Sequence, residues 1–95
     1  MDSTGFTDQL RHDGYDDVSV AGFAPGHALD EHAHPYALRG LVTDGEFVIA
    51  VGGDEQSYRV GDVFELDRDR PHTERVGPDG VTFVIGRRHP ADTGS

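Results

Sequence analysis

The sequence predicts an all-β domain, an antiparallel sandwich or barrel that carries one short N-terminal helix. Valine outnumbers leucine ten to five, and 13 glycines and five prolines are spread through the 95 residues. This composition is typical of strands and turns. From Tyr15 onward, short apolar segments alternate with Gly, Asp and Pro turns at a spacing of roughly 8–12 residues, which favours a sandwich or barrel over a mixed fold.

The N-terminal helix is expected over residues 6–13. Phe6 and Leu10 are four positions apart, so they share one face of a helix. A helix this short is not stable alone, and its apolar face must therefore pack on the rest of the domain. The candidate caps are Thr4 or Thr7 at its start and Gly14 at its end.

The strands are expected to follow one another to residue 88. They occupy residues 17–24, 28–34, 36–43, 47–51, 56–60, 63–66, 72–76 and 81–88. Asp44-Gly45 predicts a two-residue hairpin turn, and Gly77–Gly80 predicts a turn before the last strand. We expect about eight or nine short strands. They form a single domain over residues 1–95, with a helix segment (1–14), a barrel (15–88) and a polar tail (89–95).

The charge balance excludes several classes of partner. The chain has 18 acidic residues, eight arginines and no lysine, and its formal net charge is −10. A nucleic acid or an anionic membrane requires clustered cations, so neither is expected. The absence of cysteine excludes disulfides, thiolate ligands and cysteine nucleophiles. The first ten residues lack a signal-peptide pattern, and we expect a cytoplasmic protein.

Two histidines are spaced as metal ligands on a strand. His32 and His34 are two positions apart, so both imidazoles point to the same face, within reach of one ion. The alternative is a pair of polar side chains that face solvent. His27 lies an odd number of positions before His32, which turns it away from that face. His12, His27 and His89 are therefore expected to have general surface roles.

The surroundings of this pair resemble the cupin superfamily. Its first motif, G-x5-H-x-H-x3-4-E-x6-G, lies on residues 26–45. Its second motif, G-x5-P-x-G-x2-H-x3-N, lies on residues 61–76. The resemblance covers about residues 18–88 in order, with the short inter-motif spacing of minimal single-domain cupins. It implies a small jelly-roll barrel and three metal ligands, namely His32, His34 and His72.

The sequence departs from both motifs. Leu38 stands where the first motif has its glutamate, and Arg39 cannot replace that ligand because it is permanently cationic. Asp67, Asp69 and Val76 replace the proline, glycine and asparagine of the second motif. With the three histidines kept, the pattern resembles the three-histidine sites of some cupin dioxygenases. The resemblance implies one divalent transition metal ion, and Fe, Zn, Ni, Cu and Mn are not distinguished by these ligands.

Three further residues are candidates for the chemistry. Glu74 shares a strand face with His72, so it is an alternative ligand, a proton acceptor or a support for a ligand; otherwise it forms an ion pair with a neighbouring arginine. Tyr36 shares a face with His34, and it either donates a hydrogen bond to a bound ligand or fills the barrel. Arg39 either meets an anionic substrate or faces solvent.

A metal-dependent enzyme is the first functional hypothesis. A barrel of about eight strands leaves room for one small molecule, so we expect an oxygenase, or a related lyase or isomerase, that acts on a small polar molecule. The alternatives are a non-catalytic module that binds or senses a small ligand, and a structural homodimer with a vestigial site. A homodimer is expected through the N-terminal helix and strand 17–24, because an open sheet edge invites pairing. Apolar positions on the last strands should line the cavity: Phe64, Leu66, Val81, Phe83 and Ile85.

Overall fold

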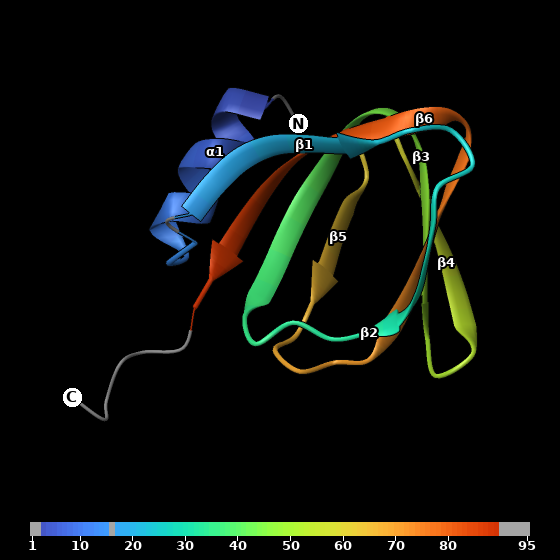
Figure 1. Ribbon diagram of the computed structural model, residues 1–95. Coiled ribbons are helices and arrows are strands. Elements are labelled where there is room, and N and C mark those ends of the chain that lie inside the picture. Colours follow the sequence, from blue (N-terminus) through green and yellow to red (C-terminus); the bar gives the residue numbers. More distant parts are fainter. Residues whose placement is uncertain (1–2, 16, 90–95) are drawn as a thin grey trace.

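The computed structural model describes residues 3–15 and 17–89, which form one helix and six strands of one antiparallel sheet (Figure 1). The elements are α1 (Ser3–His12), β1 (Asp17–Phe23), β2 (Ala28–His32), β3 (Ala37–Val51), β4 (Asp54–Arg59), β5 (Val63–Leu66) and β6 (His72–Arg88). The predicted class is confirmed: the fold is mostly antiparallel β-sheet with one N-terminal helix.

Two long strands, β3 and β6, replace four of the strands that the sequence predicts. The prediction of a hairpin at Asp44-Gly45 is wrong, because β3 continues through these residues and pairs with β6 on both sides of them. The turn at Gly77–Gly80 is wrong for the same reason, because β6 passes through it. The register shifts on either side of Asp44-Gly45, and Gly45 and Gly80 have φ values of 80° and 77°. The glycine signals therefore mark a bulged bend that both strands share, not two chain reversals.

The bend allows each long strand to pair with a different partner at each end. The first part of β6 pairs with β2 and the last part with β1. In β3, the first part pairs with β5 and the last part with β4. At the bend itself a Cβ on Gly45 would lie 1.9 Å from the carbonyl oxygen of Gly80, so the close approach requires glycine there. The sheet consequently curves around one interior (Figure 1).

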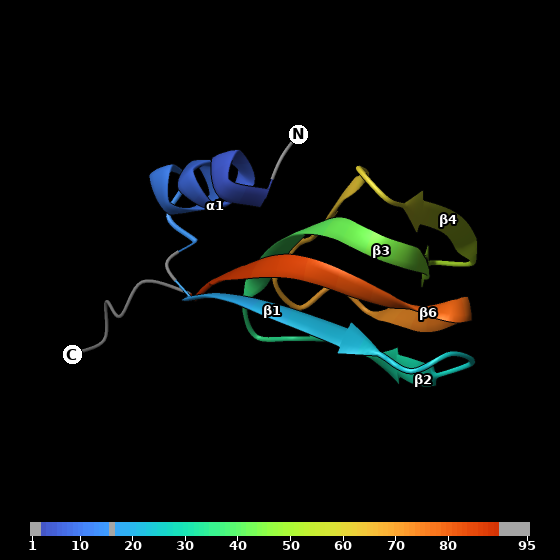
Figure 2. The same ribbon diagram turned by 90° about the horizontal axis from the view of Figure 1, so that it is seen from above.

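The helix α1 packs on the outside of this curved sheet, away from β2 (Figure 2). It begins at Ser3, so Thr4 and Thr7 lie within it and neither is the N-cap that the sequence predicts. Its end at Gly14 is as predicted: Gly14 has a φ of 90°, and the Tyr15 amide donates to the Leu10 carbonyl at 2.8 Å. Its buried residues join an outer cluster of six side chains: Phe6, Leu10, Tyr15, Ala37, Leu41 and Val84.

The inner face of the sheet carries the larger apolar core. Its members are Leu38, Val42, Phe47, Ile49, Phe64, Leu66, Val76, Val81, Phe83 and Ile85. All five side chains expected to line the cavity are among these core residues. Phe64, Phe83 and Ile85 line a cavity beside the histidines, and Leu66 and Val81 do not. A Cβ on Gly40 would lie 2.2 Å from the Phe64 ring, so the absence of a side chain at position 40 leaves space for that ring.

Strand β1 pairs with β6 alone among the described strands, so it is an edge of the sheet, and Val20 on it is 70% exposed. The homodimer through this strand and the helix stays a prediction, as does the cytoplasmic location. No helix within residues 3–15 and 17–89 has the length and apolar character needed to cross a bilayer. Of the expected tail, His89 is described and residues 90–95 lie outside the described residues.

Candidate metal centre

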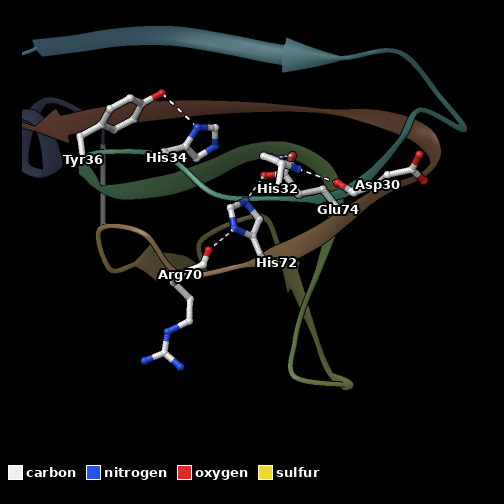
Figure 3. A network of polar contacts seen from close by, with 7 residues as sticks. All are labelled: Asp30, His32, His34, Tyr36, Arg70, His72 and Glu74. Atoms are coloured by element: carbon white, nitrogen blue, oxygen red, sulfur yellow. Dashed lines mark hydrogen bonds and ion pairs between the residues drawn. The ribbon is translucent and has the colours of Figure 1, made fainter.

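The three predicted histidines lie together with Glu74 at one end of the interior (Figure 3). His32 ends β2 and His72 begins β6, and the two are register partners. His34 lies two residues after β2, and Glu74 lies on β6. One ligand atom from each of the four residues lies within 4.8 Å of the others. This spacing allows all four groups to bind a single ion.

Backbone carbonyls orient two of the imidazoles. Nδ1 of His32 lies 2.7 Å from the carbonyl oxygen of Asp30, and Nδ1 of His72 lies 2.9 Å from that of Arg70 (Figure 3). A carbonyl oxygen only accepts, so each Nδ1 carries a proton and donates it. In the neutral ring, each Nε2 is then left with its lone pair. Such support is typical of metal-bound histidines.

These Nε2 atoms face the carboxylate of Glu74. Nε2 of His72 lies 3.2 Å from one of its oxygens, and Nε2 of His32 lies 3.8 Å from the other. Two nitrogen lone pairs and an anionic carboxylate repel one another unless a cation or a proton lies between them. The side chains of His72 and Glu74 are 1% and 10% exposed and that of His32 is 28% exposed, so water reaches this group only from the His32 side. The donor set therefore fits a divalent cation.

Glu74 places a carboxylate beside the three histidines, whereas the glutamate of the first motif is absent. The alternative of an ion pair with Arg75 or Arg39 is not what the structure shows. Arg75 pairs with Glu55 at 3.1 Å, and Arg39 pairs with carboxylates on the outer face. From the sequence, only the three histidines are predicted as ligands, and Glu74 has several candidate roles, one of which is an alternative ligand. The signal in the sequence was the two-residue spacing between His72 and Glu74, which places both side chains on the same face of the strand.

His34 and Tyr36 form a stacked pair beside this group. Their ring centroids are 5.1 Å apart, and the Tyr36 hydroxyl oxygen lies 3.3 Å from Nδ1 of His34. Burial lowers the pKa of His34, and the nearby His32 and His72 lower it further. The neutral imidazole, which is the form that binds a metal, is thereby favoured.

The structure does not bring Arg39 to the site. Leu38 points into the interior, so the next residue on β3 points outward. The Arg39 guanidinium lies 2.6 Å from an oxygen of Asp13 and 2.5 Å from one of Glu65, and it covers the ring of Tyr15. Its contacts hold the chain after α1 against the sheet. The structure therefore places Arg39 in ion pairs on the outer face, away from the cluster of three histidines and Glu74.

The other histidines lie outside the group. His27 stacks on the Phe23 ring, with centroids 4.7 Å apart. His12 is an exposed residue at the end of α1, and His89 lies 3.6 Å from the carboxylate of Asp17. None of the three belongs to the cluster of four ligand residues.

A cavity of about 140 Å³ adjoins His32, His34 and Glu74. Its wall is mainly aromatic and aliphatic, and it includes Tyr36 and Leu38. It also includes Arg87, which the sequence analysis did not single out. The signal was available, because Arg87 follows Phe83 and Ile85 at the two-residue period of one strand face. The lining residues are Ala21, Phe23, Leu29, His32, His34, Tyr36, Leu38, Phe47, Phe64, Glu74, Phe83, Ile85 and Arg87.

Fold and site together define a small β-barrel with a histidine-rich ligand group at one end. Residues 19–85 match the family model of the cupin domain, and the chain belongs to that family. This finding confirms the resemblance that the two motifs indicate.

Individual relatives agree with this assignment. The chain is 29% identical over 69 residues to dimethylsulfoniopropionate lyase DddW from Ruegeria pomeroyi; the match covers 73% of this chain and 45% of that protein, so the chain spans less than half of the relative's length. A crystal structure of a cupin superfamily protein from Desulfitobacterium hafniense superimposes with a TM-score of 0.66 at 19% identity, covering 79% of this chain and 70% of the other. The structure of a Rhizobium leguminosarum protein of unknown function superimposes with a TM-score of 0.72 at 15% identity. The match covers 77% of this chain and 69% of the other. These two structures are evidence for the fold alone.

Proposed function

We propose that the protein binds one divalent transition metal ion through His32, His34, His72 and Glu74, and that it acts on a small polar molecule. The observation that carries the proposal is the meeting of two imidazole lone pairs and a carboxylate at a position where His72 is fully buried and His32 is partly exposed. The bound ion would supply Lewis acidity at the end of the cavity. Fe, Zn, Ni, Cu and Mn all suit nitrogen and carboxylate ligands of this kind.

Elimination is the reaction class that we favour among oxygenation, elimination and isomerisation, because the relative reported above is named a lyase. The residues of this chain would bind and orient the substrate. Tyr36 lines the cavity, and its hydroxyl is held by His34, so it is positioned to exchange a hydrogen bond with a substrate atom. The aromatic wall would exclude water from the reacting groups.

A non-catalytic module that binds a small ligand is the second candidate. One observation favours it: the cavity of about 140 Å³ beside the histidines has the size to hold a small ligand, whether or not that ligand is converted. The two candidates share the metal and the cavity and differ in turnover. Substrate consumption therefore separates them, with dimethylsulfoniopropionate as the first probe for elimination and dioxygen uptake as the measure of oxygenation.

The metal itself is tested by elemental analysis of protein purified without a histidine tag. We expect close to one divalent ion per chain after reconstitution. His72→Ala should lose most of it, with an affinity reduced at least about 100-fold because a buried ligand is removed. His12→Ala is the matched control, since this exposed histidine lies on the helix. The proposal fails if no metal binds after reconstitution with several divalent ions, or if His72→Ala retains it.

A further inference from the structure

Arg87 is one of three arginines, with Arg11 and Arg88, that have no ion pair within the described residues. It lines the cavity beside the proposed metal ligands. Its hydrogen bond to the Ser19 hydroxyl is long, at 3.5 Å. Five other arginines each lie within 4.0 Å of a carboxylate oxygen: Arg39, Arg59, Arg68, Arg70 and Arg75. A cation in a cavity without a carboxylate partner is suited to an anion that enters from outside.

The sheet directs Arg87 inward. Strand alternation on β6 places it on the same face as Phe83 and Ile85, whereas Arg88 lies on the outer face over the ring of Tyr15 at 4.9 Å. The Arg87 guanidinium lies 5.8 Å from the ring centroid of Tyr36, which in turn stacks on His34. Arg87 is therefore one aromatic ring away from the proposed metal ligands.

The cavity limits what this arginine can bind. Its volume of about 140 Å³ is close to that of an engineered cavity of about 150 Å³ that holds benzene. Four phenylalanines line it, namely Phe23, Phe47, Phe64 and Phe83. Such a space suits a short molecule with an apolar middle and does not suit a phosphorylated metabolite. A guanidinium matches a carboxylate through two parallel hydrogen bonds.

We propose that Arg87 binds the carboxylate of a small organic acid whose other end reaches the histidine cluster. This inference rests on the proposed metal site, and it names the substrate class of that site. Arg87 would then determine specificity for one anionic end of the substrate, at the part of the cavity that Tyr36 separates from the ligands. Its loss would remove a positive charge near His34 and would leave the four candidate ligand residues in place.

The test uses two probes that differ in one charge. Succinate has a carboxylate for each end of the cavity, and succinamate replaces one carboxylate with a neutral amide. Calorimetric titration of the metal-loaded wild type should show succinate binding roughly 10-fold more tightly or better, the range of a hydrogen bond between charged groups. In Arg87→Gln this preference should fall to about one, while the metal remains bound. Arg87→Lys should retain part of it, because the charge remains and the paired hydrogen bonds are lost.

Arg88→Gln is the matched control, since it removes the neighbouring arginine from the outer face and should leave the preference unchanged. The inference is overturned if the wild type does not prefer succinate, or if Arg87→Gln and Arg87→Lys keep the full preference. A separate titration with the metal alone distinguishes the two proposals. If the wild type binds no metal, the proposed function is wrong and this inference falls with it. If metal binds and the preference does not depend on Arg87, only this inference is wrong.

Discussion

The two faces of the β3–β6 sheet both bury apolar side chains, and both carry ionic groups, but they treat charge in opposite ways. On the outer face, the Arg39 cation lies between the carboxylates of Asp13 and Glu65, so charge is matched within the protein. On the inner face, Glu74 lies against imidazole nitrogens whose lone pairs also repel a negative charge. The charges on the outer face are balanced without a ligand, whereas a bound cation would relieve the repulsion on the inner face.

Neighbouring residues on the same strand are divided between these two environments. Leu38 lines the cavity while Arg39 holds the segment after α1, and Arg87 lines the cavity while Arg88 covers Tyr15. The residue type alone does not distinguish an arginine that stabilises the fold from one that is available to a ligand. The partners of each arginine do, because an ionic group that the fold has already neutralised contributes little to binding.

The largest effect is expected from removing a core side chain on either face. Phe64 is 1% exposed and its ring meets those of Phe47 and Phe83 edge to face, and Leu10 is fully buried where α1 packs on the sheet. Phe64→Ala should lower the free energy of unfolding by about 3–5 kcal/mol and Leu10→Ala by about 2–5 kcal/mol, as measured by denaturant titration. Only Phe64→Ala should also weaken succinate binding by the folded, metal-loaded protein. Equal weakening by Leu10→Ala would contradict the separation of the two faces.

A smaller effect is expected from moving the carboxylate of the inner face from position 74 on β6 to position 38 on β3. Leu38 occupies the glutamate position of the first motif and lines the same cavity as Glu74. Glu74→Gln should weaken metal binding, and adding Leu38→Glu should restore it, with a gain for hard ions such as Mn(II). Without metal, a buried carboxylate at position 38 should destabilise the fold by about 1–3 kcal/mol or become protonated.

The measurement is the melting temperature of each variant with and without Mn(II). The double variant should be stabilised by Mn(II) more than Glu74→Gln alone. Leu38→Gln in the Glu74→Gln background is the control, since it has the same size and shape without the charge. If Mn(II) stabilises the double variant no more than this control, then position 38 does not share an ion with the histidines.

Much of the site could be predicted from the sequence because strand periodicity is local. The two-residue period placed His32 with His34 and Glu74 with His72, and the resemblance connected the two pairs. The sequence could not show which of several roles Glu74 has, because that depends on the register between β2 and β6, where His32 is paired with His72. The sequence could not identify Arg87 as a candidate binding residue, because this role depends on the absence of a carboxylate partner, which only the structure shows.

The strand pattern was less well predicted, and the reason is physical. Asp44-Gly45 and Gly77–Gly80 have the residues of turns, because a positive φ is required at Gly45 and Gly80. The same φ serves a bulge inside a continuous strand. Nothing local distinguishes a chain reversal from a bend, since the difference is made by the partner strand that continues on the other side. The predicted helix start was three residues late because its Phe6–Leu10 pattern marks the buried face and not the first turn.

The smallest effect is expected on the outer face, from Arg39→Gln. The arginine lies between two carboxylates near solvent, so its loss should lower the melting temperature by only a few degrees and leave metal affinity unchanged. The acid side of the pH profile gives the sharper readout. Hydrogen bonds from Gln9 and then from Arg39 lower the pKa of Asp13 below 3.8. The unfolded chain therefore binds more protons than the folded protein in this range, and stability is lost as the pH falls from about 4 through the lowered value.

Arg39→Gln should raise the pKa of Asp13 toward its ordinary value, so this part of the acid loss should shrink. The inner face affects stability at a higher pH. Burial lowers the pKa of His34, so the unfolded chain binds a proton there more readily than the folded protein. The metal-free protein should therefore lose stability as the pH falls from about 6.5. Denaturation midpoints of the metal-free wild type and Arg39→Gln, measured from pH 7 to pH 2 at low salt, separate the two faces. The profiles should fall in parallel between pH 7 and about 5 and should approach each other below about pH 4. Gln9 and Arg39 together lower the pKa of Asp13 in the wild type, whereas only the Gln9 hydrogen bond remains in Arg39→Gln. A variant that changes the upper part of the profile and not the lower would show that Arg39 acts on the inner face, and the division between the faces would then be wrong.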